Sequence, residues 1–132
     1  MCAFEQSKKG MIVKMKKYRK NLGIKGELVA EKFLKEKRYK IICKNFYTRR
    51  GEIDIVAQKE KLIVFVEVKT RSNLKYGTPS MAVNSTKLQH MKVAAKIFLT
   101  LNKFTKYDIR FDVIEVFCIN GKCNINHIKQ II

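Results

Sequence analysis

The chain has 132 residues, a length that suits one domain with one hydrophobic core. It carries 29 lysines and arginines against 11 aspartates and glutamates, so its formal net charge is +18 at pH 7, and an excess of this size favours polyanionic partners such as nucleic acid. No run of about 18 or more apolar residues is present, which excludes a transmembrane helix and makes a membrane partner unexpected.

Residues 1–20 are predicted to form a basic, flexible tail ahead of a single domain over residues 21–132. The tail lacks the continuous apolar core of a secretory signal, so the cytoplasm is the expected compartment. Two interpretations stay open, an arm that binds nucleic acid and a disordered extension. In the second, Met11 or Met15 would be an alternative start.

A first helix is predicted from Asn21, its N-cap, to about Lys37. Its apolar residues recur at the spacing of a buried stripe, namely Gly26, Val29, Ala30, Phe33 and Leu34. On a helical wheel Glu27 lies at the edge of this stripe, while Glu31 points farther out. Glu27 is therefore the glutamate that could lean toward a sheet, although an exposed helix glutamate is the simpler interpretation of the sequence alone.

A strand is predicted over residues 39–46, followed by a turn and a hairpin over residues 51–70. Three charged residues interrupt the apolar runs of this hairpin, Asp54 in its first strand and Glu67 and Lys69 in its second. A charged group on a half-buried strand is unfavourable unless it is paired, solvated in a cleft or bound to a metal. The hairpin is thus the predicted active site.

Strand periodicity predicts how these charges lie. With Lys59-Glu60 as a two-residue turn, Asp54 lies opposite Phe65 and diagonal to Glu67 on the same face, where a metal ion would bridge the two carboxylates. The same pairing sets Glu52 directly opposite Glu67. Any turn of even length keeps Asp54 and Glu67 on one face, whereas a slip by one residue would separate them.

A loop over residues 70–80 leads to a second helix that is predicted to begin near Ser85. On this helix Val93 and Ile97 form a small apolar strip, which fits either a homodimer contact or ordinary exposed aliphatic side chains. Lys87 flanks the core face and His90 points away from it, and we leave both outside the predicted site.

The chain is predicted to end in two strands, over residues 109–118 and from the turn to Ile132, joined by the type I′ turn signal Asn120-Gly121. This turn sets Cys118 opposite Cys123, near enough for a disulfide. Because the cytosol is reducing, we expect the two cysteines to be thiols.

The sequence of Asp54 followed by Glu67-Val68-Lys69, in a strand-turn-strand context, resembles the signature of the PD-(D/E)XK restriction-endonuclease-like superfamily. More closely, the chain resembles the bacterial YraN-like family, which is similar to archaeal Holliday junction resolvases. The matching segments are, in order, Gly26-Glu27 with Ala30 and Leu34, Gly51-Glu52-Ile53-Asp54, Phe65-Val66-Glu67-Val68-Lys69, a helix with Lys87, and Arg110-Phe111-Asp112-Val113. The resemblance implies an α/β fold with a restriction-endonuclease-like αβββαβ core, a mixed sheet flanked by helices, here with an extra C-terminal strand.

The same resemblance implies a metal-dependent endonuclease that hydrolyses phosphodiester bonds of DNA in preference to RNA, branched DNA included. Asp54, Glu67 and Glu27 would hold Mg²⁺ or Mn²⁺, and Lys69 would orient the attacking water or stabilise charge on the phosphate. The alternative is a non-catalytic nucleic-acid-binding module with the same fold. A charged hairpin with coincidental spacing is a third interpretation.

Overall fold

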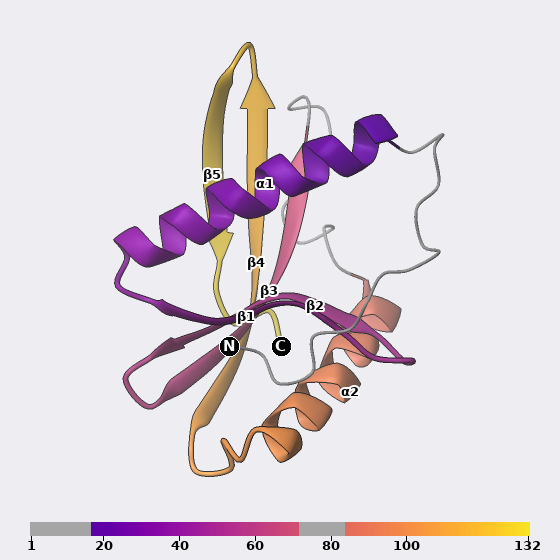
Figure 1. Cartoon of the computed structure of the whole chain (residues 1–132), viewed down its shortest axis with the longest axis vertical. Coiled ribbons are helices and arrows are strands. Elements are labelled where there is room, and N and C mark those ends of the chain that lie inside the picture. The colour runs from indigo at the N-terminus through magenta and orange to yellow at the C-terminus, as the bar shows by residue number, and fades with distance from the viewer. Residues whose placement is uncertain (1–16, 72–83) are drawn as a thin grey trace.

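The computed structural model describes residues 17–71 and 84–132, which form two helices and one five-stranded sheet (Figure 1). The elements are, in chain order, α1 (Lys17–Glu36), β1 (Lys40–Tyr47), β2 (Glu52–Lys59), β3 (Leu62–Arg71), α2 (Ser85–Leu101), β4 (Asp108–Ile119) and β5 (Lys122–Ile128). Residues 1–16 of the predicted tail and residues 72–83 of the predicted loop lie outside the described residues. Neither described helix is both long and apolar enough to cross a membrane.

The strands lie in the order β1-β2-β3-β4-β5, and all neighbours are antiparallel except β3 and β4, which are parallel. The predicted α/β architecture with one mixed sheet is therefore confirmed. α2 connects the parallel pair, as a crossover between parallel strands requires. β3 lies at the centre of the sheet, so its side chains are covered on both faces.

Each face of the sheet carries its own apolar core, and β3 contributes alternate residues to the two. Ile63 and Phe65 pack in a cluster with Met91 and Phe98 of α2. Val64 and Val66 pack in a second cluster, with Ala30 and Leu34 of α1. This alternation follows from the two-residue period of a strand. The two helices thus cover opposite faces of the strand that carries Glu67.

The N-terminal end of α2 agrees with the prediction, whereas α1 extends beyond its predicted N-cap. α1 covers Lys17–Glu36, so the helix includes the four residues before the predicted N-cap at Asn21, none of which is glycine or proline. α2 starts at Ser85 as predicted, with Asn84 as N-cap, whose Oδ1 accepts a hydrogen bond of 2.8 Å from the N–H of Lys87. The apolar strip predicted on α2 is not free, since Ile97 packs against the core beneath that helix.

The hairpin between β2 and β3 turns one residue later than predicted. Lys59 pairs with Leu62, so the turn residues are Glu60 and Lys61, and Glu60 takes a left-handed φ of 55°. The pairing continues to Ile55 opposite Val66. The predicted pairings of Asp54 with Phe65 and of Glu52 with Glu67 are therefore wrong by two positions. Because two is an even number, Asp54 and Glu67 keep a common face.

The last hairpin has the predicted turn and the predicted pairing of Cys118 with Cys123. Asn120 and Gly121 both have positive φ values, 51° and 80°, as a type I′ turn requires. The structure joins Cys118 and Cys123 in a disulfide, which corrects the expectation that they are separate thiols. Direct cross-strand pairing explains the bond, since it leaves the two Cα atoms 4.0 Å apart.

Candidate functional site

Asp54 lies on β2 just beyond the last residue paired with β3, and only 9% of it is exposed. Its Oδ2 accepts a hydrogen bond of 2.8 Å from the backbone N–H of Val68 on β3. Burial raises the pKa of this carboxyl well above its ordinary value, and the charge of Glu67 raises it further, while the bond from Val68 acts in the opposite direction. Within residues 17–71 and 84–132, no cation lies within ion-pair distance of the Asp54 carboxyl to compensate it.

Glu67 is 4% exposed and lies between two lysines. Its Oε2 is 3.3 Å from the ammonium of Lys69 on the same strand, and its Oε1 is 3.6 Å from the ammonium of Lys87 on α2. Within the described residues Oε1 is buried and has no hydrogen-bond partner. One oxygen of this carboxylate therefore has a charge nearby but no donor that satisfies it.

A cleft of about 300 Å³ opens beside Asp54. Glu27 of α1 and Glu52 at the start of β2 line it together with Asp54, and the charges of both glutamates also raise the pKa of Asp54. Glu27 is half-buried, so the structure places it toward the sheet rather than in solvent. The three acids stand close together on a chain of net charge +18.

Two glycines let the helices approach the strands of the site. A Cβ on Gly26 would collide with the side chain of Thr70, so α1 can lie this close to the end of β3 only because position 26 has no side chain. A Cβ on Gly51 would lie 2.5 Å from the carbonyl oxygen of His90 on α2. These contacts explain why a glycine precedes each of the cleft glutamates, Glu27 and Glu52.

The arrangement fits a divalent cation that brings part of its own coordination shell. Among residues 17–71 and 84–132, no three carboxylate, histidine or cysteine side chains converge closely enough to form a complete metal cage. Mg²⁺ ordinarily keeps several waters and takes one or two carboxylates together with substrate phosphate oxygens. Asp54 and Glu67 meet that need, because both are buried and one Glu67 oxygen lacks a donor. Glu27 would act from the cleft through water rather than as part of a preformed cage.

The structure brings all four predicted site residues, Glu27, Asp54, Glu67 and Lys69, to one end of the β2–β3 hairpin. Two further charged residues join them that the sequence interpretation left out. The sequence placed Glu52 opposite Glu67 without counting it as a site residue, and the structure places it in the lining of the cleft. Lys87 was missed because a position beside the core face of a helix does not reveal where a long side chain ends.

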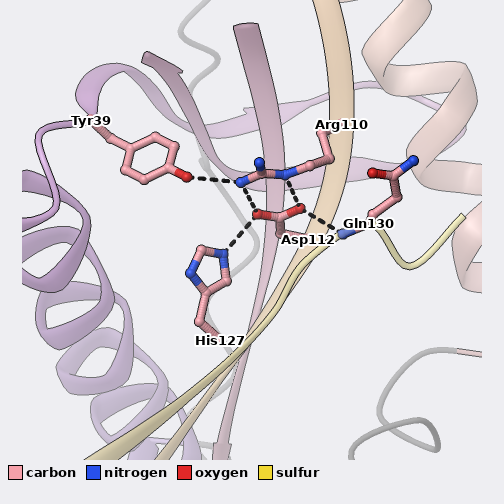
Figure 2. A network of polar contacts seen from close by, with 5 residues as sticks. All are labelled: Tyr39, Arg110, Asp112, His127 and Gln130. Atoms are coloured by element: carbon pink, nitrogen blue, oxygen red, sulfur yellow. Dashed lines mark hydrogen bonds and ion pairs between the residues drawn. The ribbon is translucent and has the colours of Figure 1, made fainter.

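A second polar cluster is centred on Asp112 of β4 (Figure 2), and it shares no residue with the lining of the cleft. Asp112 is fully buried and accepts two hydrogen bonds of 2.8 Å from the guanidinium of Arg110, whose Nη2 also donates to the hydroxyl of Tyr39. Nε2 of His127 lies 2.7 Å from Asp112 Oδ2, and the backbone N–H of Gln130 donates to Oδ1 at 3.0 Å. This cluster ties β4 to β5 and to the segment after α1.

Burial alone would raise the pKa of Asp112, but the hydrogen bonds from His127, Arg110 and Gln130 outweigh it and hold that pKa below its ordinary value. The buried aspartates therefore differ in environment. Asp54 faces other acids across an open cleft, whereas Asp112 has donors on both oxygens. The first has the electrostatics of a binding site, and the second has those of a structural contact.

Comparison with known proteins shows which family the chain belongs to. A model of the uncharacterised protein family UPF0102 matches residues 26–116, which include all of the charged site residues. A UPF0102 protein of Syntrophomonas wolfei is 43% identical over 83% of this chain and 95% of its own length. Another from Caldicellulosiruptor bescii is 48% identical over 85% of this chain and 94% of its own length. A third, from Clostridium perfringens, is 45% identical over 88% of this chain and 97% of its own length. The chain therefore belongs to the UPF0102 family, as its resemblance to YraN-like proteins predicted.

Proposed function

We propose that this protein is a Mg²⁺- or Mn²⁺-dependent endonuclease with a restriction-endonuclease-like core, and that it hydrolyses phosphodiester bonds of DNA, branched DNA included. The observation that carries the proposal is the meeting of Asp54 and Glu67 at the end of one hairpin, with Lys69 at 3.3 Å from Glu67. Two buried carboxylates facing a polyanion are unfavourable for a protein that only binds it. They are useful if a cation comes between them and a phosphate.

The basic residues and the acidic site would have different roles in binding the substrate. Lysines and arginines attract the phosphate backbone through a charge of +18, and the acids then receive the phosphate only when it is accompanied by a divalent cation. When bound, that cation would neutralise charge on the phosphate and polarise it toward attack by water. Asp54 and Glu67 would hold it, with Glu27 contributing through water.

Lys69 would act on the substrate itself. It is one-third exposed, so its ammonium can reach a phosphate while it still touches Glu67. There it would donate hydrogen bonds to a non-bridging oxygen and stabilise the negative charge that grows there as water attacks phosphorus. Glu67 fixes the position of that ammonium. Lys87, on the other oxygen of Glu67, would neutralise the carboxylate before the substrate arrives.

The proposed setting is the cytoplasm, where bacterial DNA lies. A symmetric four-way junction would suit a homodimer that presents two such sites, as in the Holliday junction resolvases that the motif resembles. DNA rather than RNA is proposed as the substrate on the same resemblance.

Metal-dependent cleavage of a DNA panel tests the proposal. Duplex, single-stranded, flap and four-way-junction DNA are incubated with the wild-type protein, Asp54→Ala and Lys69→Ala in Mg²⁺ or Mn²⁺. We expect wild type to cut at least one substrate and both variants to lose cleavage while they retain salt-sensitive binding. Equal residual cleavage by all three proteins would indicate a contaminating nuclease and count against the proposal.

A second function is favoured by one observation. Glu67 already has two lysines as partners, so its charge is compensated without a metal, and the described residues contain no complete metal cage. A non-catalytic nucleic-acid-binding module would have these properties. It predicts binding that weakens roughly 10³-fold or more between low and moderate salt if six or more phosphates are contacted, with no effect of divalent metal beyond screening.

A further inference from the structure

The cleft beside Asp54 has an apolar wall that the proposed chemistry does not use. Ile24 and Leu28 of α1 line it, and they are exposed by 48% and 55%. They stand four residues apart, so they lie on one face of the helix as neighbours. Together they give the cleft a small apolar surface on which an apolar or planar group can pack.

β1 supplies the polar and aromatic part of the same cleft. Tyr47 and Asn45 line it opposite the helix, and Glu52 and Asp54 line it from β2. A half-buried tyrosine offers a ring on which a planar group can stack, and an asparagine amide can pair with the donor and acceptor edge of a base. The cleft, of about 300 Å³, is at the lower end of small-ligand sites and is too small for a duplex.

We infer that this cleft receives one unpaired nucleobase next to the phosphate that is cut, so that the substrates of the site are DNAs with unpaired or displaced bases rather than continuous duplex. The inference rests on the proposed function, because Asp54 borders both the cleft and the site of hydrolysis. It names a substrate class that the positions of the carboxylates alone do not define.

Electrostatics select the base over the rest of the nucleotide. The cleft is lined by three acids, Glu27, Glu52 and Asp54, and by one lysine, Lys44, which is paired with Glu31 at 2.9 Å. Without a bound cation the acids therefore repel phosphate, which disfavours the backbone inside the cleft. An uncharged base is not repelled by these acids. A carboxylate also accepts hydrogen bonds from an exocyclic amino group, such as the N4 amine of cytosine. The cleft should therefore prefer bases that carry an amino group to thymine.

Fluorescence of 2-aminopurine tests this inference without any cleavage. The probe is a duplex with one unpaired 2-aminopurine, compared with the same duplex in which that base is paired and with one that has an abasic site there. Binding is measured in EDTA. We expect wild type to bind the unpaired probe roughly tenfold more tightly than either comparison duplex, with a saturable change in 2-aminopurine fluorescence.

Two variants and a matched control assign the effect to the cleft. Leu28→Asn and Tyr47→Ala should bring the affinities for the three probes close to equal, and Leu28 is exposed enough that its change leaves the fold intact. Leu101→Asn changes another exposed leucine, 45% exposed at the end of α2 and outside the cleft, and should keep the preference. Equal affinity of wild type for the three probes, or identical behaviour of the Leu28 and Leu101 variants, would overturn the inference.

The outcome is separable from that of the nuclease proposal. If the probe with the unpaired base is preferred but no substrate of the cleavage panel is cut, the base cleft stands and the nuclease proposal fails. If continuous duplex is cut as fast as branched or bulged DNA and no probe is preferred, the nuclease stands and the base cleft is wrong.

Discussion

Lys87 of α2 holds its ammonium 3.6 Å from Oε1 of Glu67 on β3. The contact joins the helix to a buried carboxylate oxygen that has no hydrogen-bond partner in the described part of the chain. It also gives Glu67 a second cation in addition to Lys69. In the protein without metal, Lys87 thus supplies part of the positive charge that a divalent ion would supply.

Replacing Lys87 should therefore lower the free energy of unfolding more in the absence of metal than in its presence. We expect Lys87→Ala to lower the free energy of unfolding by about 1 kcal/mol in EDTA, because a buried carboxylate loses a nearby charge, and by less in millimolar Mg²⁺. Urea unfolding under the two conditions measures this. Lys92→Ala, a change at an exposed lysine of the same helix, serves as control and should show no dependence on metal.

Asp54→Asn should stabilise the metal-free protein at neutral pH. The pKa of Asp54 is raised in the folded state, so the stability that its neutral form contributes is complete below the ordinary value of 3.8 and is lost as pH rises through the raised pKa. An asparagine removes this loss and can still accept the bond from Val68. We expect a gain of about 1–3 kcal/mol near pH 8 that shrinks on acidification.

Urea unfolding in EDTA between pH 4 and pH 8 measures the difference between Asp54→Asn and wild type. Glu60→Gln, at the exposed turn of the same hairpin, is the matched loss of one negative charge. If both variants showed the same pH profile, the effect would come from net charge and not from burial of Asp54.

Asp112→Asn should act in the opposite direction. The pKa of Asp112 is depressed in the folded state, so its contribution is present above 3.8 and lost as pH falls through the depressed pKa. Removing the charge of the buried Asp112 leaves the partly buried guanidinium of Arg110 without its anionic partner, and we expect a loss of about 3–5 kcal/mol at pH 7. Thermal and urea unfolding report it. The exposed Asp108, changed to asparagine, should behave like wild type.

Gly23 and Gly26 both lie on α1, but only Gly26 faces β3. Alanine substitutions at the two positions therefore distinguish the effect of close packing against β3 from the effect of helix propensity. Gly26→Ala should destabilise the protein by about 1–3 kcal/mol, because the new methyl group meets Thr70, and adding Thr70→Ala should recover part of the loss. Gly23→Ala introduces a methyl group into open space and should stabilise by up to about 1 kcal/mol. Equal effects at positions 23 and 26, measured by urea unfolding, would contradict the close approach of α1 to β3.

The shared face of Asp54 and Glu67 was predictable from sequence. It depends only on whether the turn of the hairpin has an even number of residues, and not on which residues form the turn. Asp54 and Glu67 share a face for any turn of even length, so a turn one residue late at Glu60-Lys61 shifted their pairing and left their common face intact. The same shift displaced Glu52 from its predicted place opposite Glu67. Residues whose role depends on the absolute register are therefore the ones that the sequence interpretation misplaced.

The cluster around Asp112 was beyond prediction for a different reason. Arg110 and Asp112 were noted as a motif, but Tyr39 lies 71 residues before Arg110, and His127 lies 15 residues after Asp112. No local periodicity connects these segments, since only the assembled sheet brings them together. The same holds for Lys87, whose contact depends on the path of a long side chain.

The position of Asp112 also bears on how the chain folds as it is made. Asp112 is synthesised before His127 and Gln130, two of the groups that satisfy its carboxylate. Until they emerge, β4 carries a charge that it cannot bury without cost, and the N–H of Ile131 is not yet available to the carbonyl of Phe111. A chain truncated before residue 127 is therefore expected to remain sensitive to protease even though it contains α1, α2 and β1 to β4. A fusion partner joined after residue 132 would need a linker long enough to leave residues 127–131 free to complete the sheet.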